Sequence, residues 1–556
     1  MKQQVWKIKD IDPKAKIIAG KANLPIHLIQ VLLNRGIKPA DFDSFLQSSI
    51  EQLHSPLLLP DIEKASQRIL SAIKSKQKVL VFGDYDVDGI TSLAIFNQFA
   101  KGHKDVFKFY IPHRIKEGYG LNTQAILKAK EERVSLIIAF DCGTNATAEV
   151  ELARSLGIDM IVVDHHLIKD KIYPFAFINP QRDDFPYPFA HLSSGAISFK
   201  LLQVLTGSSC IEVLDLVALS IVCDVVPLKG ENRVLLKEGL KVLKKTDRLA
   251  IKALCSVAKL KQTNIDTFHI GYILGPRINA SGRVAHAKSS LELFFTDDSQ
   301  EAQELAAKLG EYNSLRRNIE NQILKEAEQK ISHDFSDKNT IVVSGENWHP
   351  GVLGIVASRL ADKYQKPSFV ISFDQGKGVG SARSVAGVHL IQMLDLCAES
   401  LLAYGGHKKA AGVHIHKDEL ENFKDKINSI IEENIKPEDF MPVIDIDARL
   451  DFSEIDPELA QIMESLKPWG EANKKPLFAS FSLTKKSQPR KISFGYSLWL
   501  SNGKYTHEAV IFDKDLLEIV NYAEKLDIVF SLDFNTYHNI PRITVKDCRI
   551  SDYQEK

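Results

Sequence analysis

Short apolar runs, each followed by a helical pattern, organise the first half of the chain. VLVF (79–82) is apolar without interruption, which is typical of a strand buried on both faces of a parallel sheet. TSLAIFNQF (91–99) then carries its apolar residues at helical spacing. We expect further strands in FKFYIP, VSLIIAF and DMIVV, with helices between them. This alternation predicts an α/β fold with a doubly wound parallel sheet.

Acidic and imidazole side chains stand where these predicted strands end. The carboxyl ends of parallel strands meet at one edge of a sheet, where ligands bind in such folds. One more acid follows the apolar helical pattern IEVLDLVALSIVC, just before Pro227, which would end that helix. We therefore expect one pocket to collect these groups: Asp84, Asp86 and Asp88 after VLVF, Asp141 after VSLIIAF, Asp164, His165 and His166 after DMIVV, and Asp224 after the helix.

The rest of the chain predicts four further parts. Residues 1–60 have the pattern of a small helical lead-in to the parallel-sheet domain at 61–288. Charged, helix-favouring sequence predicts a long connecting helix in 289–335, running from about Ser289 to Lys330. A second α/β pattern occupies 336–436, and short β-rich segments separated by turns predict a small β-barrel in 437–556.

Composition indicates the number of domains and argues against a secreted, membrane-bound or disulfide-linked protein. A chain of 556 residues is expected to form two to four domains. Lys and Arg number 71 and Asp and Glu number 71, so any basic surface must be local. The N-terminus has no apolar segment of the kind found in signal peptides, and long apolar runs are absent, so we expect no secretion and no membrane contact. The six cysteines show no CxxC spacing, which favours a reduced cytoplasmic protein.

The crowded acids point to metal chemistry. Asp84, Asp86 and Asp88 lie within five residues and would resist joint ionisation without a positive charge between them. A set of carboxylates and imidazoles suits Mn²⁺, and it suits Mg²⁺ where water fills the remaining positions. Two such ions about 3.5–4 Å apart can activate a water and clamp a phosphate for in-line attack. The pattern predicts hydrolysis of a phosphodiester or a pyrophosphate.

Other proteins use a similar acidic motif for different purposes. A calcium loop would need Glu at its twelfth position, which is Ile95 here. A phosphatase of the DxDGT type would use one Asp as a nucleophile, but Ile90 interrupts that motif and the two histidines would have no role. A single Asp at such a place would more often be a helix N-cap. The recurrence of metal-competent groups at later strand ends argues against that interpretation for the whole set.

These motifs resemble a known family. DYDVDG, Asp141 with CGT, the DHH at 164–166 and Asp224 in CDVVPL resemble the four motifs of the DHH phosphoesterase superfamily. GVGSARS and GGHKKAAG resemble its DHHA1 domain. The segments RINASGR, EGYGL and LKPWGEANKKPLF narrow the resemblance to the RecJ family of bacterial exonucleases. The resemblance implies 5′→3′ hydrolysis of single-stranded DNA to 5′ mononucleotides, in DNA recombination and repair. It also implies a monomer that works with a single-strand-binding protein and a helicase.

The resemblance implies a metal centre with two cations, Mn²⁺ or Mg²⁺. Matched position by position, one ion would be held by Asp86 and Asp84, the other by Asp88, His165 and Asp224, with Asp141 as the bridge. Phe82 stands where many relatives have a His, which leaves the shell of the first ion short of that ligand.

Two further residues complete the expected catalytic set with Asp141. His166 matches a position that contacts the substrate phosphate. Asp164 is expected to orient a histidine, since ligating imidazoles usually donate their other N–H to an acceptor.

The same resemblance implies which residues bind DNA. Arginine offers bidentate geometry for a terminal 5′ phosphate, and the glycines of GVGSARS allow close approach of the backbone. The C-terminal barrel resembles an OB-fold, which follows single strands with basic and aromatic side chains. The implied 5′-phosphate pocket is Arg114, Ser381 and Arg383; the strand contacts are Arg277, Asn279 and Arg283; the glycine turn is Gly405, Gly406 and His407; and the barrel candidates are Trp469, Lys474, Lys475, Arg490 and Lys491. Trp469 could instead fill the barrel core.

Two other functions stay open. Shorter members of the superfamily cleave oligoribonucleotides, cyclic dinucleotides or pyrophosphate, and the extra residues 437–556 argue against that interpretation. A non-catalytic replication scaffold would resemble eukaryotic relatives that have lost metal ligands. The acids and the histidine expected for the second ion are all present here, which favours an active enzyme.

Overall fold

The computed structural model describes residues 4–118, 120–334, 338–435, 441–535 and 538–551. Two compact units share the chain, and each contains segments that are distant in sequence. One consists of Leu53–Val226 and Leu235–Met441, the other of Met1–Gln52, Pro227–Val234 and Pro442–Lys556. The expected boundaries at 335/336 and 436/437 lie outside the described residues.

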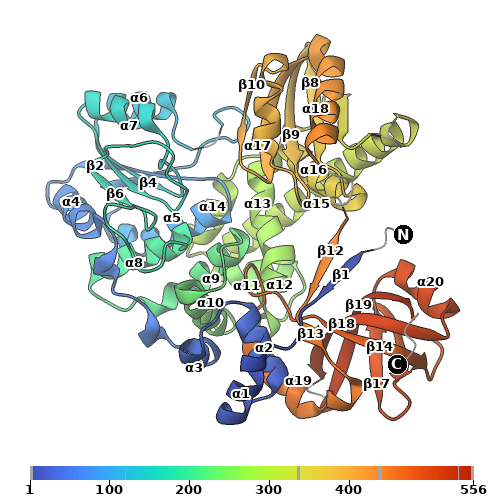
Figure 1. The fold of residues 1–556 in the computed structure, drawn as a ribbon. Coiled ribbons are helices and arrows are strands. Elements are labelled where there is room, and N and C mark those ends of the chain that lie inside the picture. Colours follow the sequence, from blue (N-terminus) through green and yellow to red (C-terminus); the bar gives the residue numbers. More distant parts are fainter. Residues whose placement is uncertain (1–3, 119, 335–337, 436–440, 536–537, 552–556) are drawn as a thin grey trace. The chain divides into compact units, whose positions relative to one another are not determined.

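The larger unit begins with the predicted parallel sheet. Its strand order is β3-β2-β4-β5-β6, and every neighbouring pair is parallel. Helices α6 and α7 cover one face, where Ile126 and Val150 pack against Phe82 and Val162, and α4, α5 and α8 lie on the other (Figure 1). The strands are β2 (Lys78–Gly83), β3 (Phe107–Tyr110), β4 (Val134–Phe140), β5 (Asp159–Val163) and β6 (Ala176–Ile178). The helices are α4 (Ile62–Lys74), α5 (Val87–Ala100), α6 (Thr123–Glu131), α7 (Thr147–Ser155), α8 (Ser194–Thr206) and α9 (Leu214–Cys223).

A helical region follows the sheet. It contains α10 (Gly230–Leu243), α11 (Leu249–Val257), α12 (Thr267–His269), a π-helical turn (Ile270–Leu274), α13 (Gly275–Val284), α14 (Lys288–Phe295) and α15 (Ser299–Asp334). The single helix expected from about Ser289 is therefore two helices. The break occurs because Asp298 accepts a hydrogen bond from the Glu301 amide at 2.7 Å and caps the start of α15.

The second α/β part has a mixed sheet with the order β10-β11-β9-β8-β7, in which only β7 and β8 pair in parallel. Alternate residues of β8 point to opposite faces, so Phe369 packs with α18 and Val370 packs with α16. The strands are β7 (Ile341–Glu346), β8 (Ser368–Asp374), β9 (Lys377–Arg383), β10 (Ala403–Gly406) and β11 (Ala410–His416). The helices are α16 (Pro350–Tyr364), α17 (Leu390–Asp395) and α18 (Leu420–Asn434).

The smaller unit is built on the C-terminal barrel. Its strands follow the order β13-β14-β18-β19-β17-β16-β15, and pairing of β14 with β16 closes the barrel. The N-terminal helices share its core, where Leu28 and Leu32 join Phe478 and Phe530. The elements are β1 (Val5–Ile8), α1 (Pro13–Ala22), α2 (Ile26–Asn34), α3 (Phe42–Leu46), β12 (Val443–Ile446), β13 (Ala448–Arg449), α19 (Pro457–Met463), β14 (Phe478–Lys485), β15 (Arg490–Ile492), β16 (Gly495–Ser501), β17 (Thr506–Ile511), α20 (Lys514–Tyr522), β18 (Lys525–Asn535) and β19 (Ile540–Ile550).

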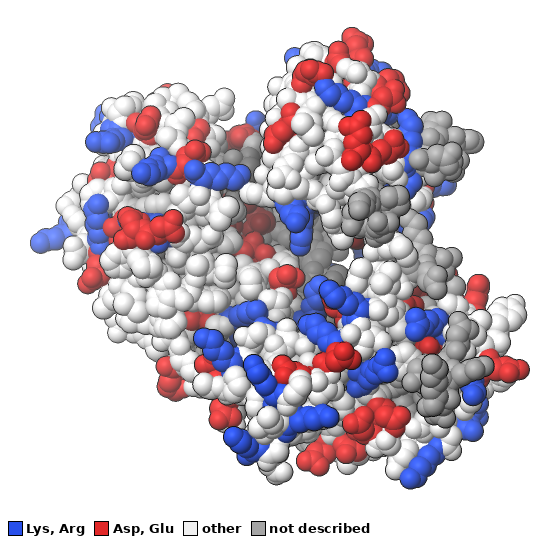
Figure 2. Space-filling view, viewed as in Figure 1, with Lys and Arg blue, Asp and Glu red and all other residues white. Residues whose placement is uncertain are grey.

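The predicted fold class is confirmed: a doubly wound parallel sheet, a long helix, a second α/β part and a β-barrel. Strands β1 and β12, which pair in parallel, were not expected from the sequence. In the described residues, no helix combines the length and apolar character needed to span a membrane. Acidic and basic side chains are interspersed over the face drawn in Figure 2, in keeping with their equal numbers.

Candidate metal centre

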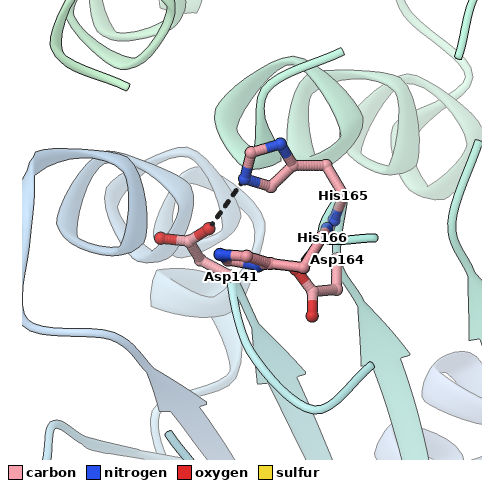
Figure 3. Close-up of side chains that lie close together, drawn as sticks. All are labelled: Asp141, Asp164, His165 and His166. Carbon is pink, nitrogen blue, oxygen red and sulfur yellow. Dashed lines mark hydrogen bonds and ion pairs between the residues drawn. The ribbon is translucent and has the colours of Figure 1, made fainter. Parts of the chain in front are cut away.

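The carboxyl ends of β2, β4 and β5 and the end of α9 bring the sequence-predicted acids and histidines together. Their ligand atoms form three overlapping groups, and within each group they lie within 4.8 Å of one another. Figure 3 shows His165 and Asp141 pointing toward each other, with Asp164 and His166 beside them. The groups are Asp84, Asp86 and Asp141; Asp88, His165 and Asp224; and Asp141, Asp164, His165 and His166. Asp141 and His165 therefore link the set.

His165 lies at the centre of this arrangement. Its Nε2 atom is 3.4 Å from Asp141 Oδ1, 3.5 Å from Asp224 Oδ2 and 3.6 Å from Asp88 Oδ2. These separations are too long for good hydrogen bonds. The nitrogen is buried and has no hydrogen-bond partner among the described residues. Three carboxylate oxygens thus lie around one imidazole nitrogen.

Burial and mutual repulsion disfavour the charged forms of the acids in this centre. Desolvation raises the pKa of Asp84, Asp86 and Asp141, and neighbouring aspartates raise each of them further. Desolvation and the nearby Asp88 raise the pKa of Asp224 to about 9. Asp84 Oδ1 and Asp224 Oδ2 are buried and have no hydrogen-bond donor in the part of the chain that the structure describes. The donor set fits a hard divalent cation such as Mn²⁺ or Mg²⁺.

The loop between β2 and α5 combines two roles. Asp86 is the N-cap of α5, because its Oδ1 accepts hydrogen bonds from the amides of Asp88 and Gly89. A side chain at Gly89 would place its Cβ 2.5 Å from the carbonyl oxygen of Asp84, so only glycine fits this turn. The helix-cap interpretation therefore describes one oxygen of Asp86, while the residue still belongs to the acidic group.

Asp164 and His166 form a hydrogen-bonded pair at the edge of the centre. Asp164 Oδ1 accepts from the backbone amide of His165 at 2.7 Å and lies 2.7 Å from His166 Nδ1. Burial alone would raise the pKa of Asp164, but the hydrogen bond with His166 and the charge of His166 lower it overall. Burial lowers the pKa of His166, yet the bond to Asp164 prevails and raises it to about 9. The His166 imidazole is therefore protonated at neutral pH.

Phe82 occupies the position where the family resemblance implied a histidine. The side chain is fully buried and packs against Tyr110, with the ring centroids 5.4 Å apart. The group at Asp84, Asp86 and Asp141 consists of carboxylates only, whereas the group at Asp88 and Asp224 includes His165.

Arg114 and Arg283 lie near the acids, and Arg383 lies near Arg114. The Arg114 guanidinium lies 4.9 Å from the centroid of the Tyr85 ring, a contact that the sequence did not indicate. Desolvation and then the charge of Arg114 lower the pKa of Arg283 to about 10. Desolvation and Arg114 also lower the pKa of Arg383, which donates to the carbonyl of Ala382 at 2.8 Å. This crowding of like charges favours an anion as ligand.

The other predicted DNA contacts are more scattered. Asn279 Oδ1 accepts from the Val87 amide at 3.0 Å, so it holds the start of α5. Arg277 donates to the Ile273 carbonyl at 2.7 Å. Ser381 lies beside Arg383 on β9, where a Cβ at Gly354 would come within 3.0 Å of its hydroxyl. Gly405 and Gly406 end β10, and the His407 amide closes the hairpin on the Ala410 carbonyl at 2.8 Å.

Comparison with known proteins shows which family this chain resembles in sequence. The models of the DHH family N-terminal domain, the DHHA1 domain and the RecJ OB domain match residues 78–221, 337–433 and 446–547. RecJ of Bacillus subtilis is 33% identical over 564 residues, covering 99% of this chain and 71% of that protein. The chain belongs to the RecJ family. RecJ of Escherichia coli is 32% identical over 509 residues, covering 86% of this chain and 87% of that protein.

Solved RecJ structures agree on the fold. RecJ from Thermus thermophilus in complex with Mn²⁺ has a TM-score of 0.82 at 24% identity, over 99% of this chain and 80% of that one. An exonuclease RecJ bound to manganese has a TM-score of 0.59 at 30% identity, over 68% of this chain and 96% of that one. RecJ structures thus hold manganese or, in a second Thermus thermophilus structure, Mg²⁺, and this chain has acidic and histidine groups positioned to hold metal ions.

The pKa of Asp224 leads to a pH-dependent stability of the metal-free protein. Its ordinary value is 3.8 and its folded value is about 9, so folding favours the protonated form. This contribution is complete below the ordinary value and is lost as the pH rises through the folded one. In EDTA, we expect the unfolding temperature of wild type to fall, relative to that of Asp224→Asn, as the pH is raised from about 5 to about 9.

Saturating Mn²⁺ should reverse this trend in wild type, adding about 2.7 kcal/mol at one hundred times the dissociation constant, and should do less in the variant. Scanning calorimetry measures both effects. The exposed Asp247→Asn serves as control, because its side chain is 93% exposed. If the unfolding temperatures of wild type and Asp224→Asn changed with pH in parallel, the raised pKa of Asp224 would be contradicted.

Proposed function

We propose that this chain is a divalent-cation-dependent exonuclease that hydrolyses single-stranded DNA from the 5′ end to 5′ mononucleotides, in DNA recombination and repair. The observation that carries the proposal is the meeting of three aspartate oxygens within 3.6 Å of one buried imidazole nitrogen, beside a second group of aspartates. The relatives compared above are named single-stranded-DNA-specific exonucleases.

The acids and histidines of the metal centre would have different roles in the reaction. Asp84 and Asp86 would hold one cation, Asp88, His165 and Asp224 the other, and Asp141 would be shared. When bound, the cations supply an activated water and neutralise charge on the reacting phosphate. The protonated His166, held by Asp164, can donate to a phosphate oxygen from the rim of the centre, where its side chain is 40% exposed.

The arginines would make the enzyme start at the 5′ end of the strand. Arg114 and Arg383 are close enough for their charges to repel, and Ser381 adds a hydroxyl beside Arg383. A terminal 5′ phosphate carries more negative charge than an internal linkage, so it suits this cluster best. Arg114 also acts electrostatically on Asp84, so the cluster lies near the acids.

Loss of the shared aspartate should abolish hydrolysis without abolishing DNA binding. Asp141 has φ of 60°, a left-handed conformation that Asn tolerates better than Ala, so Asp141→Asn preserves the backbone. We expect a rate at least about 10³-fold lower, on the scale of losing a major charge-stabilising group. Release of mononucleotides from a 5′-labelled single strand in Mn²⁺ measures it, with strand binding measured alongside.

The same assay separates the alternatives. Binding without cleavage by wild type would support a scaffold, and preference for dinucleotides would support the short-substrate interpretation. A near-normal rate for Asp141→Asn would overturn the metal assignment.

Removing Arg383, the arginine of β9, should selectively reduce cleavage of strands that carry a 5′ phosphate. Arg383→Ala is expected to reduce cleavage of 5′-phosphorylated strands about 10- to 100-fold, the scale of a charge-assisted contact of about 1.5–3 kcal/mol. Cleavage of 5′-hydroxyl strands should change far less. Lys377→Ala is the matched control, since it removes an exposed charge from the same strand. Equal losses on both substrates would count against the terminal pocket.

The barrel offers a separate surface for the single strand. A groove of about 650 Å³ is lined by Arg490, Lys491 and Trp499, among others. Trp499 is 45% exposed, whereas Trp469 packs partly buried against the barrel core. Lys475 is paired with Asp533, while Lys474 is exposed. The groove thus joins the basic and aromatic groups that single-strand binding uses, with Trp499 in the place expected for Trp469.

Trp499→Ala should weaken binding of long single strands by about 1–3 kcal/mol, the value of one stacked base, while cleavage of short oligonucleotides stays near wild type. Fluorescence anisotropy with strands of several lengths tests this. Tyr522→Ala is the control, because that exposed aromatic lies on α20 and does not line the groove. Equal effects of the two variants would exclude the groove.

We propose that the enzyme is a cytoplasmic monomer that works with a single-strand-binding protein and a helicase. The free state of all six cysteines in the structure supports a reducing compartment. Light scattering and pull-down with those two partner classes test these points.

A further inference from the structure

The carboxylate of Asp88 is held by an unusually complete set of donors. It is 1% exposed, and its Oδ2 accepts from the Ser194 amide at 2.9 Å. Its Oδ1 accepts from the Gly195 amide at 2.9 Å and from the Ser220 hydroxyl at 2.6 Å. Two of these donors are the first amides of α8, and the third comes from α9. The orientation of Asp88 is thus decided by two helices other than its own.

The Ser220 hydroxyl has two neighbours and one proton. Its Oγ lies 2.6 Å from Asp88 Oδ1 and 2.6 Å from Ser193 Oγ. A carboxylate can only accept, so the Ser220 hydroxyl is the donor in its bond to Asp88. The hydroxyl is also placed as donor toward Ser193 Oγ, so the two acceptors compete for one proton and the charged carboxylate is the stronger of them.

Ser220 also fixes a second residue of the centre. Its backbone carbonyl accepts from the Asp224 amide at 3.0 Å, at the end of α9. One residue therefore binds Asp88 through its side chain and Asp224 through its backbone. These are the two aspartates that lie 3.6 and 3.5 Å from His165 Nε2 within a single group.

Helices α8 and α9 pack tightly around Ser220. A Cβ at Gly195 would lie 2.5 Å from Ser220 Oγ, so α8 and α9 are in close contact here. Asp88 would keep its two amide donors but lose the one that comes from the helix carrying Asp224.

We propose that Ser220 is a positioning residue that sets the cation affinity of the site formed by Asp88, His165 and Asp224. The inference rests on the proposed function only in taking these three residues as ligands. Partners that hold metal ligands in place typically change metal affinity by about 10- to 100-fold when they are removed.

The experiment compares Mn²⁺ binding by full-length wild type, Ser220→Ala and Ser198→Ala, using electron paramagnetic resonance of free Mn²⁺ and calorimetric titration. Ser198 is the matched control, because its hydroxyl is buried on α8 and has no hydrogen-bond partner among the described residues. We expect Ser220→Ala to weaken one class of Mn²⁺ site by about 10- to 100-fold and Ser198→Ala to leave both classes unchanged. In assays, Ser220→Ala should need more Mn²⁺ for half-maximal rate and approach the wild-type kcat at saturation.

Failure of the ligand assignment and failure of the role of Ser220 give different results. If Asp224→Asn binds Mn²⁺ with the same stoichiometry and affinity as wild type, the ligand assignment itself is wrong. If Asp224→Asn loses a site but Ser220→Ala binds as tightly as wild type, only the role of Ser220 is overturned. A lower unfolding temperature of metal-free Ser220→Ala with unchanged Mn²⁺ affinity would likewise reduce Ser220 to a structural residue.

Discussion

Repulsion among aspartates that are shielded from water is the constraint on which the centre depends. Asp84 and Asp141 are almost fully buried, and desolvation is the largest cause of the raised pKa of both. The acids come from separate strands, so the packing of the whole sheet holds them together against their mutual repulsion. A cation inverts the sign of this interaction, because each carboxylate that opposed the others then contributes to binding it.

The parts of this arrangement that follow from local sequence could be predicted. The apolar run before Asp84 and the proline after Asp224 indicate where a strand and a helix end, and chain geometry then brings those ends to one edge. The break before α15 also had a local signal, since Asp298 followed by Glu301 is typical of a helix start. The roles of the individual ligands came from family resemblance and remain proposals.

Features that depend on tertiary packing could not be predicted. Ser220 sits in an apolar helix, and nothing in its spacing indicates that its hydroxyl meets Asp88. Asn279 resembles a DNA contact in sequence, yet the fold uses its side chain to hold the Val87 amide. Trp469 and Trp499 are equally aromatic in the sequence, and only the closed barrel makes the second of them line a groove.

Backbone strain shows how firmly the scaffold imposes this geometry. Asp141 has φ of 60°, and Val225, directly after Asp224, has φ of 58°. A left-handed conformation is costly for a β-branched residue, and it persists only where the surrounding structure overdetermines it. Asp141 follows a strand that is almost wholly buried, and Val225 follows a helix whose packed residues include Ser220. The strained residues therefore lie where rigid elements end, so the ligands are oriented before a cation arrives and binding need not reorganise the backbone.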